Sequence, residues 1–178
     1  MPDTRQSVLH TGLLHVTTIY LLSLLNCVTA DARDFPLASC KSANGTIIQM
    51  SGTNTDHATM VGTVTAPDAM EYCDRDPGGE TTANGGPKTV EACVAEYLKR
   101  ENGAQYRAIA NCPQHILESN AGRGMERFRL VRNDEGAFAW GSIRTGRTLG
   151  NSCGDGTPPL FEQFKILCPR EASNIELP

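Results

Sequence analysis

Three groups of side chains in this 178-residue sequence could do chemistry: acidic residues beside glycines, a run of arginines, and the cysteines. The acidic group is Asp74–Glu80, in which carboxylates at alternate positions precede a glycine pair. Such spacing is typical of calcium loops, but a complete loop also needs a bidentate glutamate at its twelfth position, which is Gly85 here. We therefore interpret the segment as a solvated turn and predict no metal and no cofactor.

Arginines gather in one part of a chain whose net charge is −4. Between residues 121 and 150 the bases are Arg123, Arg127, Arg129, Arg132, Arg144 and Arg147, and the acids are Glu126, Asp134 and Glu135. A basic region of this kind suits an anionic partner such as a phosphate backbone. The alternative is that the arginines occupy the solvent face of a sheet without binding anything.

The start of the chain predicts a secretory signal peptide at residues 1–32. Thr11–Ala30 is apolar and uncharged, and Ala30-Asp31-Ala32 is typical of a cleavage site, with the cut after Ala30 or Ala32. The alternative is a single membrane-anchor helix, for which the apolar run is short. We expect residues 33–170 to form a single secreted disulfide-rich domain without a membrane span, and residues 171–178 to be a frayed tail.

The cysteines support that interpretation, because one of the seven, Cys27, lies in the segment that would be removed. The six that remain are Cys40, Cys73, Cys93, Cys112, Cys153 and Cys168. An even number in a secreted chain predicts a disulfide framework, whose connectivity the spacing leaves open. Only His57 and His115 would remain as histidines, and no two of the cysteines have the C-x-x-C spacing, so zinc is not predicted.

The spacing of apolar residues predicts one main helix. Thr89 suits the N-cap, and Gly103 suits the position after the C-terminus. One apolar stripe follows from the helical period; it comprises Val90, Cys93, Val94, Tyr97 and Leu98. We expect this stripe to pack on a sheet.

Strands are expected at Gly45–Met50, Thr59–Thr65, Gln105–Asn111, His115–Ser119, Met125–Arg132 and Ala137–Ile143, with Met70–Cys73 as a further short strand. Leu160–Leu167 is expected to be a short helix or a strand. The predicted fold class is α+β, with one main helix packed on an antiparallel β-sheet meander and disulfide bridges.

The clearest hairpin joins Met125–Arg132 to Ala137–Ile143. A type I turn at Asp134–Gly136, with Gly136 left-handed, pairs Leu130 with Trp140. This register places Phe128, Leu130, Phe138 and Trp140 on one face and Arg127 and Arg129 on the other.

Two further segments carry predictions. Glu71–Cys93 is interpreted as a flexible surface connection whose cysteines bridge to the sheet rather than to each other, and whose acids overhang the basic sheet. Asn44 begins an Asn-Gly-Thr sequon, a glycosylation site if the host is eukaryotic, and otherwise an ordinary Asn-Gly turn.

The segment Arg129–Gly146, followed by Asn151 and Cys153, resembles the C-terminal half of the small fungal guanyl-specific ribonucleases and of secreted ribonuclease-like effectors. The stretch Arg129-Leu-Val131 resembles their arginine strand, and Ser142–Gly146 stands where their histidine strand ends. Tyr72-Cys73 and the helix after it resemble the N-terminal half, so the resemblance covers Met70–Cys153.

In that family a glutamate takes the 2′-OH proton, a histidine protonates the leaving oxygen and an arginine stabilises the phosphorane. The resemblance implies Arg129 as the arginine, Glu118 or Glu126 as the base, and His115 as an acid from a neighbouring segment. Arg144 stands at the family's histidine position, and arginine cannot exchange a proton near neutral pH, so we do not expect efficient catalysis. Phosphate binding would then fall to Arg127, Arg129 and Arg144.

The resemblance also implies a disulfide pattern. The family's strand-to-sheet bridge corresponds to Cys73–Cys153, and the remaining pairs would be Cys93–Cys112 and Cys40–Cys168.

The leading hypothesis is a secreted, disulfide-bridged interaction protein with a ribonuclease-like fold, non-catalytic, acting as an effector that binds RNA or a host protein. A second is an active RNA-cleaving hydrolase, which requires Glu118 and His115 to share a cleft with Arg129. A third is an unrelated periplasmic or extracellular binding or inhibitor domain. A sheet that closes into a small barrel, with the helix as a lid, would favour the third over the first.

Overall fold

The computed structural model describes residues 34–38, 43–75, 86, 89–120, 124–150, 157–175 and 177. Seven strands form one antiparallel sheet in chain order: β1 (Asp34–Ala38), β2 (Ala43–Ser51), β3 (Ala58–Thr63), β4 (Gln105–Asn111), β5 (Ile116–Ser119), β6 (Glu126–Arg132) and β7 (Phe138–Ser142). The described helices are α1 (Ala66–Arg75), α3 (Val90–Glu101), α4 (Thr157–Leu167) and α5 (Pro169–Asn174). The α+β class with an antiparallel meander is confirmed. The signal peptide, Cys40, Cys153 and most of the Glu71–Cys93 connection lie outside the described residues.

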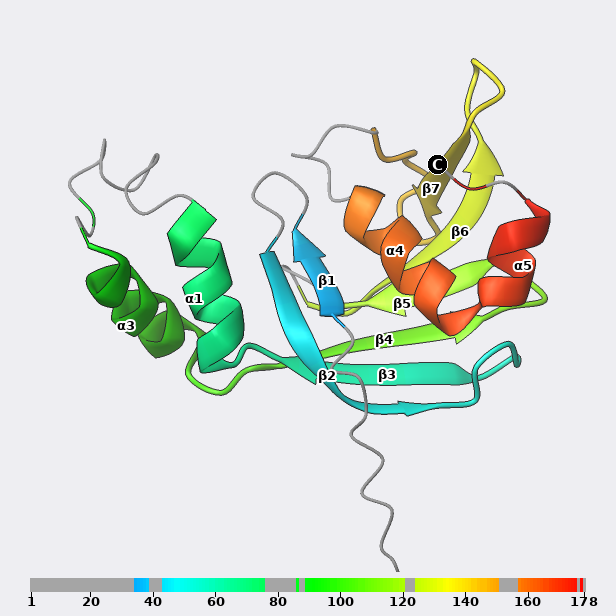
Figure 1. Cartoon of the computed structure of the whole chain (residues 1–178). Coiled ribbons are helices and arrows are strands. Elements are labelled where there is room, and N and C mark those ends of the chain that lie inside the picture. The colour runs from blue at the N-terminus through cyan, green and yellow to red at the C-terminus, as the bar shows by residue number, and fades with distance from the viewer. Residues whose placement is uncertain are drawn as a thin grey trace, which may run out of the picture.

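The sheet curls, and α4 lies inside the curl (Figure 1). This helix contacts both edge strands, β1 and β7, as well as β3, β4 and β5. We call the face of the sheet that α4 covers the inner face, and the opposite one the outer face. The core lies between α4 and the inner face; its strand residues include Phe35, Met60, Ala108, Ala110, Leu117, Phe128 and Trp140.

Aromatic packing fixes α4 against the inner face. Trp140 is fully buried, and its ring centroid lies 5.6 Å from that of Phe161 and 5.5 Å from that of Phe164. Gly62 makes room on β3, because a Cβ there would lie 2.6 Å from the buried side chain of Phe35. The interior is therefore filled by side chains from both ends of the chain.

Both edges of the sheet are protected against pairing with another strand. In β1, Pro36 has no N–H, and its carbonyl accepts a hydrogen bond from Gln163 Nε2 at 2.7 Å. Beside β7, the chain returns so that Ser142 N–H donates to Arg147 O and Leu149 N–H donates to Trp140 O.

The predicted β6–β7 hairpin is confirmed with its register. Leu130 pairs with Trp140, Asn133 N–H donates to Ala137 O at 2.8 Å, and Gly136 has φ 79°. The predicted helix is confirmed as α3, with the Thr89 hydroxyl accepting from Ala92 N–H at its start.

The prediction of a strand at Met70–Cys73 is wrong, because these residues belong to α1. The helix begins with a capping box: Thr65 N–H donates to Asp68 Oδ2 at 2.7 Å, and Asp68 N–H donates to Thr65 Oγ1 at 3.4 Å. The main helix therefore has a partner, and α3 packs against α1 through a small cluster of Val64, Ala69 and Tyr97. In Figure 1 this helical pair lies beyond one end of the sheet.

The C-terminal part of the chain is helical. Of the two alternatives for Leu160–Leu167, the helix is correct. The prediction of a frayed tail is wrong for Glu171–Asn174, which belong to α5, because Ala172 is buried in the core and Arg170 N–H donates to Asn54 Oδ1.

The three predicted disulfide pairs, Cys73–Cys153, Cys93–Cys112 and Cys40–Cys168, are wrong. Cys73 bonds to Cys93 instead, and Cys112 bonds to Cys168. The physical reason is the packing of the helices: α3 lies on α1 rather than on the sheet, with the first pair of Cα atoms 5.9 Å apart. The end of α4 reaches the β4–β5 turn, where the second pair of Cα atoms is 5.4 Å apart.

Candidate functional site

The outer face of the sheet carries exposed arginines from two strands. Register places Arg107 of β4 beside Val61, and Arg127 of β6 beside Glu118 of β5. Arg129 follows two residues after Arg127 and so projects from the same face. All three arginines are exposed. We call Arg107, Arg127 and Arg129, with the residues between them, the arginine face.

Only one of these charges is compensated by an acid in the described part of the chain. Arg127 Nε lies 3.2 Å from Glu118 Oε1, and both side chains are solvent-accessible, at 53% and 32% of their surface. No described residue forms an ion pair with Arg107 or Arg129. An exposed ion pair contributes only about 0–1 kcal/mol, so Arg127 can exchange its partner at little cost.

Two exposed apolar side chains border the arginine face. Ile143 is 45% exposed, and its backbone N–H donates to Arg127 O. This hydrogen bond continues the β6–β7 pairing by one residue, so the Ile143 side chain lies on the outer face. Met125, 48% exposed, lies two residues before Arg127 and continues the same line along β6. Large apolar residues beside arginines are characteristic of protein interfaces.

The structure does not bring His115 and Glu118 together. The His115 ring lies edge-on to Phe164 of α4, with the centroids 6.2 Å apart, on the inner side of the sheet. Glu118 is paired with Arg127 on the outer face. The acid and the base that a hydrolase would need are therefore separated by the sheet.

Arg144, the third predicted phosphate ligand, lies apart from Arg127 and Arg129. Its Nη2 is 3.9 Å from Glu126 Oε1, and the same carboxylate oxygen accepts from Ser142 Oγ at 2.8 Å. Register places Glu126 and Ser142 on the inner side. Glu126 is thus occupied by Ser142 and Arg144 and does not face Arg129.

Two tyrosines of the helical pair, and Tyr106 of β4 beside it, have structural roles. Tyr72 and Tyr97 stack with centroids 4.8 Å apart, and the Arg100 guanidinium lies 4.8 Å above the Tyr97 ring. Burial, with the nearby Glu101 carboxylate, raises the pKa of Tyr97 to about 12. Burial and the hydrogen bond that its hydroxyl donates to Glu101 also raise the pKa of Tyr106. Both phenols stay protonated near neutral pH.

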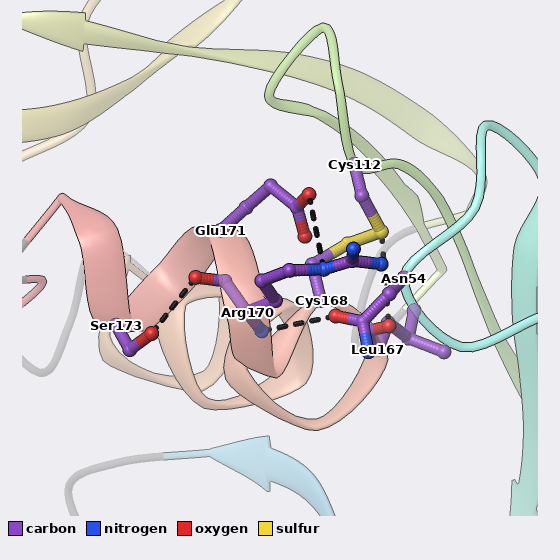
Figure 2. Close-up of polar contacts among 7 residues, drawn as sticks. All are labelled: Asn54, Cys112, Leu167, Cys168, Arg170, Glu171 and Ser173. Carbon is purple, nitrogen blue, oxygen red and sulfur yellow. Dashed lines mark hydrogen bonds and ion pairs between the residues drawn. A yellow bond between two sulfur atoms is a disulfide. The ribbon is translucent and has the colours of Figure 1, made fainter.

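A polar cluster anchors the C-terminal helices to the sheet (Figure 2). Asn54, in the β2–β3 loop, donates its N–H to Leu167 O, and its side-chain oxygen accepts from Arg170 N–H, both at 2.9 Å. The Cys112–Cys168 disulfide joins the β4–β5 turn to the same junction. These contacts fix α4 inside the curl, against the inner face, and the outer face of the sheet is not covered by this helix.

Asn44 lies within β2 rather than in a turn, and its amide donates to Asp34 Oδ2 at 3.1 Å. In the described residues, no three His, Cys, Asp or Glu side chains gather as a metal site requires. No helix in that part of the chain is both long and apolar enough to cross a membrane.

Arg107 is a residue of the arginine face that was not among the predicted phosphate ligands. The signal was present in Gln105–Asn111, where Ala108 and Ala110 alternate with Arg107 and Ile109, and the alanines are fully buried on the inner face.

Comparisons of the chain with protein-family models, with curated proteins and with solved structures find no match.

Proposed function

We propose that this protein is a secreted, disulfide-stabilised binding protein that holds an anionic partner on its arginine face. The observation that carries the proposal is the pair of exposed arginines, Arg107 and Arg129, that have no ion-pair partner among the described residues, beside Arg127. These arginines lie on a sheet that α4 supports from behind, so the backbone that carries them keeps its geometry without a partner.

Binding accounts for the geometry better than catalysis does. Glu118, the candidate base, lies on the outer face and forms an ion pair with Arg127. His115, the candidate acid, lies on the other side of the sheet. An RNA-cleaving enzyme of this kind needs a base within reach of the 2′-OH and an acid within reach of the leaving oxygen, so both must face the same bound substrate. The sheet curls around α4, but β1 and β7 do not pair, so it does not close into the small barrel that would favour an unrelated binding or inhibitor domain.

Secretion is part of the proposal. Two disulfides are consistent with an oxidising compartment, where such bonds persist. Expression of the full chain in a secreting host, followed by N-terminal sequencing of the exported protein, should give a first residue of Asp31 or Arg33. Recovery of an exported protein that still begins at Met1 would contradict this part.

The binding proposal is tested with two polyanions, poly-L-glutamate and polyuridylate, each labelled with a fluorophore and titrated at low salt. We expect both to bind, with affinity falling as salt rises. Replacing Arg107 and Arg129 by alanine should weaken binding at least about tenfold, because the uncompensated charges are lost.

The matched control removes two arginines elsewhere. Arg100 on α3 and Arg170 on α5 have side chains 63% and 67% exposed, so Arg100→Ala with Arg170→Ala changes the net charge equally. If this variant loses as much affinity as the Arg107/Arg129 variant, or if neither polyanion binds, the proposal is wrong.

A further inference from the structure

We infer that the partner of the arginine face is an extended acidic segment of another protein, in which an apolar residue and two carboxylates occupy alternate positions. This inference rests on the proposed function and names the class of partner for the same surface. Nucleic acid is the competing class, and two features of the outer face decide between them.

The first feature is the distribution of aromatic side chains. Single-stranded nucleic acids are held by basic residues together with aromatic rings on which bases stack. Every Phe, Tyr and Trp in the described part of the chain lies elsewhere: Phe35, Tyr106, Phe128, Phe138, Trp140, Phe161 and Phe164 pack in or against the core, and Tyr72 and Tyr97 lie in the helical pair. The arginine face therefore offers charge without a stacking surface.

The second feature is exposed apolar surface beside the charges. Met125 and Ile143 are about half exposed, and Val61 on β3 and Ile109 on β4 are partly exposed on the same face. Burial of such side chains stabilises a complex in proportion to the apolar area removed from water, which favours a partner that brings apolar groups of its own. Methionine and arginine are also enriched in protein interfaces.

The line of residues along β6 defines the pattern of the partner. Met125, Arg127 and Arg129 project from one face at intervals of roughly 7 Å, the two-residue repeat of a strand. An extended peptide presents its side chains with the same repeat. A segment laid along β6 can therefore place an apolar residue on Met125 and Ile143 and carboxylates on Arg127 and Arg129. Arg107 lies two strands away, roughly 10 Å, and can bind an acid on a neighbouring part of the partner.

This binding mode differs from strand addition. Both edges of the sheet are engaged, β1 by Pro36 and Gln163, and β7 by the returning chain at Arg147–Leu149. The partner is thus recognised by side chains on the open face, and charge complementarity sets its register.

The test uses three labelled probes with the full mature protein at about 150 mM salt. The first is a peptide with repeated Leu-Thr-Glu-Thr-Glu, the second is the same composition with leucines and glutamates scrambled, and the third is an oligouridylate of equal charge. We expect the patterned peptide to bind at least about tenfold more tightly than either of the others.

Variants locate the contact. Met125→Ser and Ile143→Ser together should weaken the binding of the patterned peptide about five- to tenfold. The affinity for oligouridylate should not change, because only the peptide contacts those side chains. Both positions are exposed, so the melting temperature should be unaffected and a binding loss cannot be attributed to unfolding.

Two results would overturn the inference, and they have different consequences. The partner class is wrong if oligouridylate binds as tightly as the peptide, or if the peptide binds the Met125/Ile143 variant as tightly as the wild type. In either case the arginine face still binds anions. If no probe responds to Arg107→Ala with Arg129→Ala, the proposed function fails as well.

Discussion

The two faces of this sheet differ in what they contribute, and β6 shows the difference within one strand. Phe128 is 6% exposed on the inner face, whereas the side chain of the preceding residue, Arg127, is 53% exposed on the outer face. The inner face is filled by α4 and by aromatic rings, while the outer face keeps charge without internal partners. The stability of the fold therefore depends on one face, and the binding that we propose depends on the other.

The largest effect is expected from the inner face. Trp140→Ala removes a fully buried ring that packs on Phe161 and Phe164, and should lower the free energy of unfolding by about 3–5 kcal/mol. Urea unfolding followed by circular dichroism measures it. A loss below about 1 kcal/mol would mean that the inner face is not the stabilising one.

Two glycines give a matched test of the two faces. A Cβ at Gly62 would lie 2.6 Å from Phe35, so Gly62→Ala should cost about 1–3 kcal/mol of stability. A Cβ at Gly141, which pairs with Arg129, would meet Val131 at 3.5 Å, an ordinary contact, so Gly141→Ala should be close to neutral. If thermal unfolding shows the same loss of stability for both variants, the two faces do not differ in packing as we describe.

The helical pair belongs to neither face and should contribute to the response of stability to alkaline pH through Tyr97. Burial raises the pKa of Tyr97 from 10 to about 12, so the folded state favours the neutral phenol. The contribution of neutral Tyr97 to the free energy of unfolding is complete below pH 10 and is lost as the pH rises to about 12. Unfolding measured across that range should show stability falling, and Tyr97→Phe should reduce the fall; a variant with the same decline as the wild type would contradict the assignment.

The smallest effect on stability is expected on the outer face. Arg129→Ala removes an exposed side chain with no described ion-pair partner, so the free energy of unfolding should change by less than about 0.5 kcal/mol. Its binding of polyanions should nevertheless weaken. A clear loss of stability would show that Arg129 is a structural residue.

How much of this was predictable from sequence depended on how local each feature is. The β6–β7 register followed from the turn at Asp134–Gly136, since one left-handed glycine fixes which residues pair. Helix α1 was predictable in principle from Thr65 and Asp68, but it was missed because the apolar residues near Cys73 were taken for a strand. The disulfides were not predictable, because they depend on how α3 and α4 pack, and spacing does not encode that packing.

The candidate site divides in the same way. Arg127 and Arg129 were correctly placed on one face, because alternation along a strand is local. Arg144 was grouped with them, but it follows the end of β7 and turns toward Glu126, where tertiary contacts decide its direction. His115 and Glu118 are three residues apart in the predicted strand His115–Ser119, so alternation alone indicates opposite faces. Only the contact of His115 with Phe164 required the position of α4, which comes from a distant part of the chain.

The most direct test of the central claim is an NMR titration of the isotope-labelled protein with the patterned acidic peptide. The account predicts shifts in the side-chain Nε–H signals of Arg107, Arg127 and Arg129 and in the backbone signals of β4 and β6. Signals of α1, α3 and the Trp140 indole should stay in place. Shifts confined to the helical pair, or no shifts in the arginine signals at saturating peptide, would contradict it.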